Sequence, residues 1–416
     1  MKPLTYANDE QPTTVTAKFS SRLIRNLVNR LAASIERGTL RMTLPDGSLQ
    51  EITGSASPLP TSDLQIHNAR ALRRLAMHGD IGFAEAYLAG EWSSSNLTAL
   101  LHFAMANENK LSSIVANWSS TRLMARVKHL LNTNSKRQAK KNIAYHYDLG
   151  NDFYARWLDP SMTYSAGIFR DGFSPEETSL ETSQEYKYTR LADALQITDT
   201  HSVLEIGCGW GGFMQHVVER SKAHITGVSI SEQQCRYARQ RLAKLNGGQR
   251  AEVLFKDYRD LEGRYDRIAS IEMFEAVGEK YWQTYARKLK HLLSEDGVAA
   301  LQVITINEDR FNQYRESADF IQRYIFPGGM LPSQEALAEV MRSAGLKVTD
   351  SFRFGPHYAE TLRRWRTQFD AEWTTIIKQG FDERFKRMWH YYLAYCEVGF
   401  DTGATDVVQI RLEHSS

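Results

Sequence analysis

Between residues 202 and 306, short apolar runs alternate with longer amphipathic stretches. The apolar runs have the length of buried strands and cover 202–206, 223–228, 251–256, 265–271 and 297–306. The amphipathic stretches have apolar positions at helical spacing and cover 212–220, 232–245 and 281–293. Strands that alternate with helices in this way predict an α/β, Rossmann-like doubly wound parallel sheet. Two later segments, 347–354 and 405–413, are expected to add closing antiparallel strands.

The N-terminal part of the chain has a different pattern. Apolar residues recur at helical spacing from Phe19 to Ile35, and the pattern of residues 68–109 is mostly helical. Between them, Thr39–Ile52 alternates around the turn Pro45–Ser48, which predicts a hairpin. We therefore expect a smaller, mainly helical α+β domain ahead of the large sheet.

A basic stretch separates these two patterns. Residues 122–141 contain seven lysines and arginines around the polar sequence Asn132–Ser135, which is typical of a linker. This predicts an N-terminal domain at 1–135 and a second domain at 136–416.

Two segments interrupt the strand order of the second domain. They are the helical stretch 308–343 and the aromatic-rich stretch 357–400. Insertions of this kind usually cover the carboxyl ends of the strands, where α/β sheets bind ligands. We expect residues 308–400 to form a lid and a substrate pocket.

Composition narrows the class of protein. The chain has 416 residues, 42% hydrophobic and 24% charged, with a net charge of +2, so no overall field favours nucleic acid. Its three cysteines are too few for a disulfide framework or a zinc site, so we expect reduced thiols, a cytoplasmic protein and no metal. No apolar run approaches the roughly 20 residues that span a bilayer. A membrane lipid substrate would therefore be reached from the surface.

The turn after the first apolar run of the sheet carries the candidate chemistry. Val203–Ile206 leads directly into Gly207, Gly209, Gly211 and Gly212. A strand, a glycine turn and a helix bring bare backbone against a nucleotide-like ligand. Glu205, two residues before the first glycine, suits the positively charged methionine end of S-adenosylmethionine (SAM).

Two alternatives to a SAM site exist for this turn. Gly207, Gly209 and Gly212 also fit the dinucleotide spacing G-x-G-x-x-G, which alone is weak evidence. A dinucleotide site expects an acid at the end of the second strand, but this strand ends in Ser229-Ile230-Ser231. The second alternative is a tight turn without a ligand. The missing acid favours SAM.

An ordered series of motifs extends over about residues 142 to 412. They include Tyr145–Tyr154, Met162–Ser165, Glu205–Gly212, Gly227–Ser231, Asp257–Leu261, Met273–Glu275, Tyr324–Gly329 and His357–Tyr358. In this series the chain resembles the cyclopropane fatty acid synthases, which include the mycolic acid cyclopropane synthases. The resemblance implies a class I SAM-dependent methyltransferase. Its reaction would transfer a methyl(ene) group from SAM to the double bond of an unsaturated acyl chain of a phospholipid.

The resemblance also implies a role for each candidate residue. Tyr164 and Ser165 would close over SAM, and Glu205, Gly207, Gly209 and Gly211 would hold its methionine end. Ser229 and Gln234 would lie on the ribose side, and Asp257 and Tyr258 at the adenine. Glu275 and Tyr358 would hold a bicarbonate, the base that removes a proton from the new methyl group so that a ring can close. For Tyr258 the alternative is a core aromatic residue, and for Glu275 an exposed acid at a helix start.

Three positions depart from the family pattern. The usual cysteine after Tyr-Ser is Ala166, the usual histidine after Glu275 is Ala276, and a histidine on the strand 297–306 is replaced by Gln302. Gln302 offers an amide donor to an anion but does not titrate. These departures weaken the expectation of bicarbonate and open an alternative, methylation of the alkene without ring closure. A non-lipid methyltransferase and a non-catalytic SAM- or lipid-binding protein are further alternatives.

Two basic segments bear on membrane contact. The helix 19–37 and the stretch 122–141 are candidates for docking on anionic headgroups, which predicts a protein peripheral to the inner membrane face. The alternative is a domain-packing helix and a solvated linker. A homodimer is a further hypothesis that the sequence leaves open.

Overall fold

The computed structural model describes residues 28, 30, 33–111, 149–170 and 177–415. The chain forms two compact units, one of Met1–Thr121 with Trp373–Tyr391 and one of Arg122–Glu372 with Tyr392–Ser416. Trp373–Tyr391 thus belongs with the N-terminal residues, although the sequence pattern assigns it to the second domain. The predicted boundary at 135, the basic stretch 122–141 and most of the helix 19–37 lie outside the described residues.

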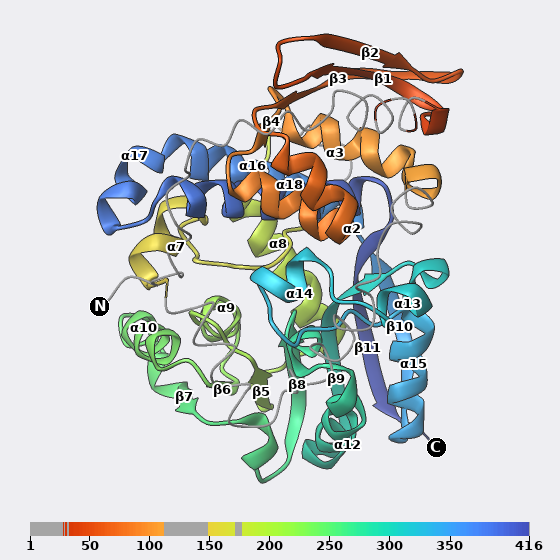
Figure 1. The fold of residues 1–416 in the computed structure, drawn as a ribbon. Coiled ribbons are helices and arrows are strands. Elements are labelled where there is room, and N and C mark those ends of the chain that lie inside the picture. The colour runs from red at the N-terminus through yellow and green to blue at the C-terminus, as the bar shows by residue number, and fades with distance from the viewer. Residues whose placement is uncertain (1–27, 29, 31–32, 112–148, 171–176, 416) are drawn as a thin grey trace. The chain divides into compact units, whose positions relative to one another are not determined.

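The first unit contains a four-stranded sheet in the order β2-β1-β3-β4 (Figure 1). The strands are β1 (Arg37–Thr43), β2 (Leu49–Thr53), β3 (Ala56–Ile66) and β4 (Trp92–Ser93). β1 and β2 pair antiparallel, which confirms the predicted hairpin. β3 is not predicted, because Pro58 and Pro60 read as breakers. They lie beside a register shift between β3 and β1, where prolines without an N–H donor are tolerated.

Helices complete the first unit. They are α2 (Arg70–Leu88), α3 (Leu97–Ala106), α17 (Trp373–Ile376), the short turn η4 (Ile377–Gln379) and the N-terminal half of α18 (Glu383–Asp401). α2 is interrupted at Gly79, which has a φ of 63°. Asn96 caps α3 by accepting a hydrogen bond from the N–H of Ala99 at 3.0 Å.

The second unit is built on a seven-stranded sheet in the order β10-β11-β9-β8-β5-β6-β7. Its strands are β5 (Ser202–Ile206), β6 (His224–Ser229), β7 (Ala251–Phe255), β8 (Tyr265–Ile271), β9 (Leu293–Ile306), β10 (Leu346–Arg353) and β11 (Thr405–His414). β7, β6, β5, β8 and β9 run parallel, and β11 lies antiparallel between β9 and β10. The predicted sheet and its antiparallel closure are confirmed. The strand order reverses between β5 and β8, the position where α/β sheets bind ligands.

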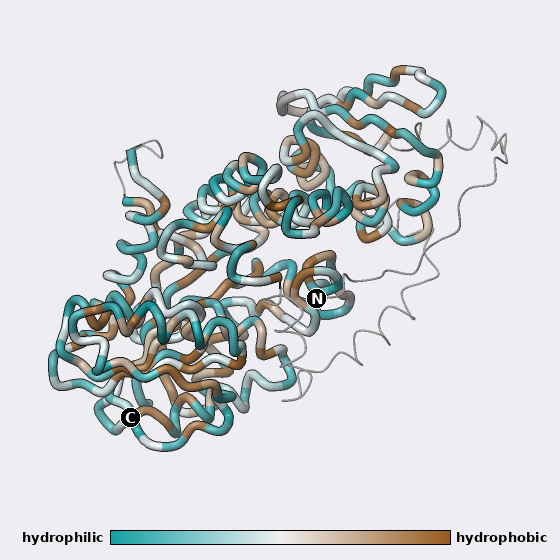
Figure 2. The backbone as a smooth tube through the Cα atoms, turned by 90° about the vertical axis from the view of Figure 1, so that its left-hand side faces the viewer, coloured by the Kyte–Doolittle hydropathy of each residue, from teal (hydrophilic) through white to brown (hydrophobic). Residues whose placement is uncertain are grey.

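Helices cover both faces of this sheet (Figure 1). One face packs on α8 (Leu180–Leu195), α9 (Gly212–Arg220) and α10 (Glu232–Leu242), and the other on α12 (Trp282–Leu292) and α15 (Gln334–Ser343). Side chains alternate between these two faces along β5. Val203 packs on the face that α8, α9 and α10 cover, and Leu204 and Ile206 pack on the face that α12 and α15 cover. Figure 2 shows hydrophobic residues concentrated along the strands and alternating with hydrophilic ones along the helices.

The remaining elements lie between the strands of the second unit. They are α7 (Asn151–Trp157), η1 (Gly248–Arg250), η2 (Tyr258–Asp260), α11 (Phe274–Val277), η3 (Glu279–Tyr281), α13 (Glu308–Tyr314), α14 (Phe320–Tyr324) and α16 (Gly355–Ala371). The predicted helical character of 308–343 is confirmed, and the aromatic-rich stretch 357–400 is helical as well. The role of both as lid and pocket stays a prediction. α15 packs on β10 and the sheet core. The helices inserted before it are therefore α13 and α14.

Candidate cofactor and catalytic site

The glycine turn follows β5 in a conformation that suits glycine. Gly207, Gly209 and Gly211 have φ values of 88°, 51° and 82°, in the left-handed region. The N–H groups of Gly207 and Cys208 both donate to the carbonyl of Val228 at 3.0 Å, which ties the turn to the end of β6. A Cβ at Gly207 would lie 2.9 Å from Cγ of Met273, whereas a Cβ at Gly209 would meet nothing within 4 Å. The backbone at Gly209 is therefore open to a ligand.

Glu205, near the end of β5, is a buried acid with an unused acceptor. Its side chain is only 3% exposed, and its Oε2 has no hydrogen-bond partner in the described part of the chain. Burial raises the pKa of Glu205 to about 8, although the nearby Lys187 lowers it. A buried carboxylate without a donor is costly, so a donor is expected from a ligand. The ammonium and hydroxyl groups of SAM are such donors, and Glu205 beside the open turn therefore fits this cofactor.

Ser165 is held from α8. The fully buried Lys187 donates from Nζ to Ser165 Oγ at 2.6 Å, and Gln184 donates to the Ser165 carbonyl at 2.8 Å. Burial lowers the pKa of Lys187 to about 7, while the neighbouring carboxylates, Glu272 first, raise it. Lys187 is not among the residues singled out from the sequence, because a lysine within an amphipathic helix reads as a surface residue.

The residues predicted for the ribose and adenine lie at the ends of β6 and β7. Ser229 and Gln234 are buried and bonded to each other, with Ser229 Oγ donating to Gln234 Oε1 at 2.9 Å. Asp257 accepts from Nε of Arg259 at 2.8 Å and from its terminal nitrogen at 2.6 Å. The backbone N–H of Arg259 also donates to Oδ1 of Asp257, at 2.9 Å, so Arg259 supplies three hydrogen bonds to this carboxylate.

Tyr258 packs into the core. Its ring lies edge-on to Tyr285, with centroids 5.3 Å apart, and belongs to the residues packed against the sheet core. Its hydroxyl is buried without a hydrogen-bond partner among the described residues, and burial raises its pKa to about 12. This placement agrees with the alternative of a core aromatic residue, and contact with adenine stays a prediction.

Tyr164 lies in a group of aromatic rings that we call the aromatic cluster. Its members are Tyr154, Trp157, Tyr164, Trp210, Phe326, Tyr358, Trp365 and Tyr392. The ring centroid of Tyr164 is 5.3 Å from that of Trp365 and 5.5 Å from that of Trp157. The hydroxyls of Tyr164 and Tyr392 are 2.7 Å apart. Aromatic faces attract cations, and the cluster is therefore suited to a sulfonium or a carbocation.

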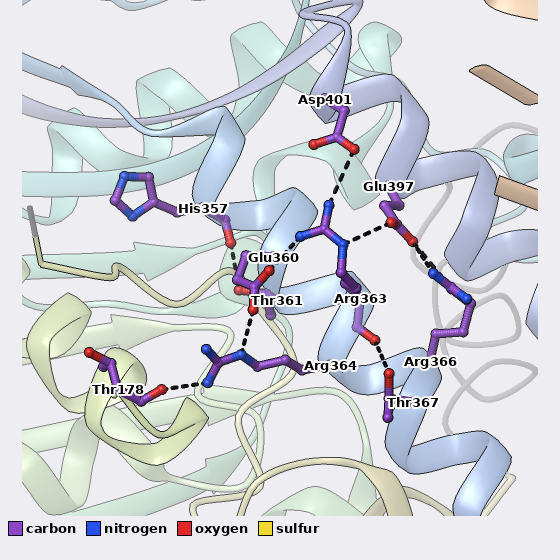
Figure 3. Close-up of polar contacts among 10 residues, drawn as sticks. All are labelled: Thr178, His357, Glu360, Thr361, Arg363, Arg364, Arg366, Thr367, Glu397 and Asp401. Carbon is purple, nitrogen blue, oxygen red and sulfur yellow. Dashed lines mark hydrogen bonds and ion pairs between the residues drawn. The ribbon is translucent and has the colours of Figure 1, made fainter. Parts of the chain in front are cut away.

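Ion pairs fasten the helix that carries Tyr358 and Trp365. On α16, Arg363 contacts Glu360, Glu397 and Asp401, and Arg366 contacts Glu397 at 2.9 Å (Figure 3). Glu397 is 2% exposed, so these contacts compensate a buried charge. The ring of Phe400, one turn further along α18, stacks on Tyr358 at 4.4 Å. The arrangement fixes the Tyr358 ring and hydroxyl.

A second acid, Glu272, follows β8 directly and was not singled out from the sequence. It is half-buried, with a φ of 48°, and its carboxylate accepts three hydrogen bonds within the described ranges. Oε1 accepts from the Ala166 N–H at 2.9 Å and from the Gln302 amide at 2.8 Å, and Oε2 accepts from the Tyr358 hydroxyl at 2.7 Å. The signal in the sequence is an acid at the carboxyl end of a parallel strand.

Among the described residues, Glu275 forms no hydrogen bond with Tyr358 or Gln302. Its Oε1 accepts from the Ile304 N–H, and its Oε2 is buried with no hydrogen-bond partner in the part that the structure describes. Burial, and then the charge of Glu272, raise the pKa of Glu275 to about 8. The side chain is 9% exposed, so the alternative of an exposed acid does not hold. The structure thus joins Tyr358 and Gln302 on Glu272, and not on Glu275.

Two of the residues expected to hold a bicarbonate already bind another anion. Tyr358 and Gln302, together with the N–H of Ala166, bind the carboxylate of Glu272. A bicarbonate at these donors would face a negative charge in a half-buried site. The residues present therefore do not fit this ion.

Comparison with known proteins identifies the family. The sequence profile described as mycolic acid cyclopropane synthetase matches residues 134–410. The chain belongs to this family. Members of the family that resemble it include the tuberculostearic acid methyltransferase UfaA1 of Mycobacterium tuberculosis, 40% identical over 95% of this chain and 91% of that protein. The cyclopropane-fatty-acyl-phospholipid synthase of Escherichia coli K12 is 33% identical over 84% of this chain and 86% of that protein.

A solved structure of the family shares the fold over about two thirds of this chain. The mycolic acid cyclopropane synthase CmaA1, in complex with SAH and CTAB, is 30% identical and superposes with a TM-score of 0.61. The match covers 66% of this chain and 97% of that one. Family and fold together show a SAM-dependent methyltransferase of class I, as the sequence predicts. Its family acts on lipid acyl chains.

Proposed function

We propose that the protein transfers a methyl group from SAM to a double-bond carbon of an unsaturated fatty acyl chain in a lipid. The observation that carries this proposal is the aromatic cluster around Tyr164. An alkene is a weak nucleophile, and its methylation leaves a carbocation on the neighbouring carbon. Water would trap that cation, whereas aromatic faces stabilise it. A polar substrate would gain nothing from such surroundings.

The residues of the glycine turn are proposed to hold the cofactor. Glu205 would accept hydrogen bonds from the methionine end of SAM, with Gly207, Gly209 and Gly211 giving it close access to the backbone. Ser229 and Gln234 would meet the ribose and Asp257 the adenine amine. When bound, SAM supplies the methyl group, and the electron pair of the broken C–S bond stays on sulfur. Tyr164 and Ser165 would position the sulfonium against the alkene.

We propose an open-chain methylated product as the main outcome. The relative described as a tuberculostearic acid methyltransferase matches 95% of this chain at 40% identity, which supports methylation without ring closure. The departures at Ala166 and Gln302 point the same way. The second candidate is a cyclopropane, supported by the 33% identity to the synthase of E. coli.

We further propose that the acyl chain belongs to a phospholipid and is taken from a membrane surface. No described helix is long and apolar enough to cross a bilayer. The basic segments 19–37 and 122–141 are the proposed contact with anionic headgroups, and a homodimer is proposed as the assembly. Binding to anionic and to neutral vesicles at low and high salt tests the membrane contact.

Deuterium labelling tests the reaction. Purified protein would be incubated with SAM carrying a trideuterated methyl group and vesicles of dioleoyl phospholipid, and the acyl products analysed by mass spectrometry and NMR. A methyl-substituted alkene keeps all three deuterium atoms, whereas a cyclopropane and an exocyclic methylene keep two. NMR then separates the last two products. Transfer of no label to any unsaturated lipid contradicts the proposed function.

A further inference from the structure

We infer that Glu272 is the base of this enzyme: its carboxylate accepts the proton that the methylated lipid cation releases, in place of a separately bound anion. The inference rests on the proposed function, since only a cation formed on the alkene needs such a base. It adds to the site a catalytic residue that the family pattern does not indicate.

The carboxylate of Glu272 is oriented but not saturated. An ionised carboxylate has about four lone-pair positions, two on each oxygen. Oε1 uses both, for Ala166 and Gln302, while Oε2 accepts only from Tyr358 among the described residues. One lone pair of Oε2 therefore stays available for a proton. Glu272 as a residue is half-buried, whereas Glu275 is buried.

The orientation of Gln302 is set by a chain of amides. Gln409 donates from Nε2 to Gln302 Oε1 at 3.1 Å and to the Lys187 carbonyl at 3.5 Å. Because its oxygen faces Gln409, the amide nitrogen of Gln302 faces Glu272 at 2.8 Å. Gln302 and Gln409 are both buried, at 0% and 3% exposure. The polar network thus extends from α8 through β11 and β9 to one carboxylate, as expected for a group held in place for chemistry.

The backbone at Glu272 supports the same conclusion. Its φ of 48° lies in the left-handed region, which is unfavourable for a residue with a side chain. Glycine would avoid this cost. The conformation is held by the hydrogen bond from the Glu272 N–H to the Gln302 carbonyl, at 2.8 Å. A strained acid kept at the switch point of the sheet is typical of a functional residue.

The two adjacent acids have different charge states. Glu272 has three donors and the cation of Lys187 to favour its ionised form, although burial, the largest influence, raises its pKa. Glu275 has one backbone donor on Oε1, and burial and the charge of Glu272 raise its pKa to about 8. The three donors therefore make Glu272, rather than Glu275, the acid of the pair that carries the negative charge. Environments that separate two acids in this way define which of them is the base.

The proton transfer balances without another reactant. The π electrons of the alkene form the new carbon–methyl bond, and the neighbouring carbon becomes a cation. Oε2 of Glu272 then takes a proton from a C–H beside the cation. The electron pair of that C–H bond becomes a double bond, or the third bond of a cyclopropane ring if the proton comes from the new methyl group. Glu272 ends as a neutral acid and returns the proton to solvent after product release.

Substitution of Glu272 in the full-length protein tests the assignment. Glu272→Gln keeps the size of the side chain but removes the base, so we expect turnover to fall by about 100-fold. The residual product should also change, with hydroxylated or isomeric lipid replacing part of the normal product. The affinity for SAM should stay within about twofold of the wild type, since Glu205 and the glycine turn are intact. Glu279→Gln, an acid on η3 that pairs with Arg315, is the matched control and should behave as the wild type.

Chemical rescue separates a base from a structural role. Glu272→Gly removes the carboxylate and suits the left-handed backbone, so this variant should fold even if Glu272→Gln does not. Added formate or bicarbonate should raise the turnover of this variant about tenfold, because either anion can bind to the three donors that the carboxylate has left. The wild-type protein should keep its turnover in buffer purged of carbon dioxide.

The outcomes distinguish the two proposals. Wild-type transfer of methyl groups, together with unchanged turnover and products in Glu272→Gln, overturns the base and leaves the proposed function standing. A wild type that loses its activity without bicarbonate also overturns the base. No methyl transfer by the wild type to any unsaturated lipid overturns both. A Glu272→Gly variant that folds, binds SAM and is not rescued by either anion counts against the base as well.

Discussion

Glu205 and Glu272 lie at the ends of two adjacent parallel strands, and yet their surroundings differ. β5 and β8 pair side by side, with Glu205 opposite Ala269. Glu205 is 3% exposed and has an oxygen without a donor, whereas Glu272 is half-buried and has three donors. Both acids feel the cation of Lys187. The chain thus supplies three donors to one acid and leaves an oxygen of the other without a donor.

The difference separates two uses of a buried acid. An acid without donors is costly in the free protein, and it recovers this cost when a ligand brings the missing donors. An acid with donors from the chain needs no ligand for its stability and is available to react. On this basis Glu205 belongs to cofactor binding and Glu272 to proton transfer.

On cofactor binding, the largest effect is expected at Glu205. Glu205→Gln removes the charge from the contact with the SAM donors, and a hydrogen bond to a charged group contributes about 1.5–3 kcal/mol. We expect the Kd for SAM to rise about 10- to 100-fold, as measured by isothermal calorimetry. Turnover at saturating SAM should change much less, since Glu272 is intact.

The stability of the variant sharpens this test. Glu205→Gln should unfold at or above the wild-type temperature, because it removes a buried carboxylate that lacks a donor. Glu272→Gln should unfold at a lower temperature, because three donors lose a charged acceptor. Glu219→Gln, an exposed acid on α9 bonded to Gln215, is the control for both measurements. Equal destabilisation at Glu205 and Glu272 would contradict the division.

The next effect concerns the donor to the reactive oxygen. Tyr358→Phe keeps the stacking on Phe400 but removes the hydrogen bond to Oε2 of Glu272. Losing a donor favours the protonated acid, so the pKa of Glu272 should rise and the acid limb of the pH–rate profile should move to higher pH. Turnover at neutral pH should fall about tenfold.

The pH profile separates this effect from a structural one. If Tyr358 had only a structural role, its replacement would not move the acid limb to higher pH. The groups that face Glu272 are Tyr358, Gln302, the Ala166 N–H, Lys187 and Glu275, and only the first is altered. Tyr186→Phe on α8 is the matched control. A shift of the acid limb to lower pH in Tyr358→Phe would count against Glu272 as the base.

The sequence predicts the region of Glu205 well, because that region is local. The strand, the glycines and the acid are contiguous in Val203–Gly212, and each follows from a rule about neighbouring residues. The same holds for the seven strands of the large sheet, whose runs match the structure to within a few residues apart from the start of β9.

The region of Glu272 is not predictable in this way. Its donors come from positions 166, 302 and 358, which are brought together only by the fold. Two acids three residues apart follow β8, and the sequence favours Glu275 only through the resemblance to a family. The N-terminal unit is similar, since Trp373–Tyr391 joins it from the far end of the chain. Local patterns specify elements, whereas long-range contacts decide which residues share a site.

A smaller effect is expected in the pH dependence of cofactor binding. The pKa of Glu205 is raised to about 8 in the free protein, so this acid is mostly protonated below that pH. SAM binds the ionised form in our proposal, and its binding should therefore release a proton and strengthen severalfold per pH unit up to about pH 8. Lys187, with a pKa of about 7, loses its charge over the same range and reduces the slope. Calorimetry in buffers of different ionisation enthalpy measures the proton released. Binding that weakens as the pH rises from 6 to 8 would contradict the assignment of Glu205.

The smallest effect is expected at Tyr258, which lies beside the proposed adenine position but packs with the core. Its hydroxyl has no partner within the described ranges, and its ring packs on Tyr285. Tyr258→Phe removes only the buried hydroxyl, whose loss should leave stability unchanged or slightly higher. If the ring is a core residue, the Kd for SAM stays within about twofold of the wild type. If the hydroxyl binds the cofactor, the Kd rises about fivefold or more, the loss of a neutral hydrogen bond. In that case the hydroxyl of Tyr258 and the Oε2 atom of Glu205 would lack partners for the same reason, because the cofactor supplies them, and both residues would belong to the cofactor site.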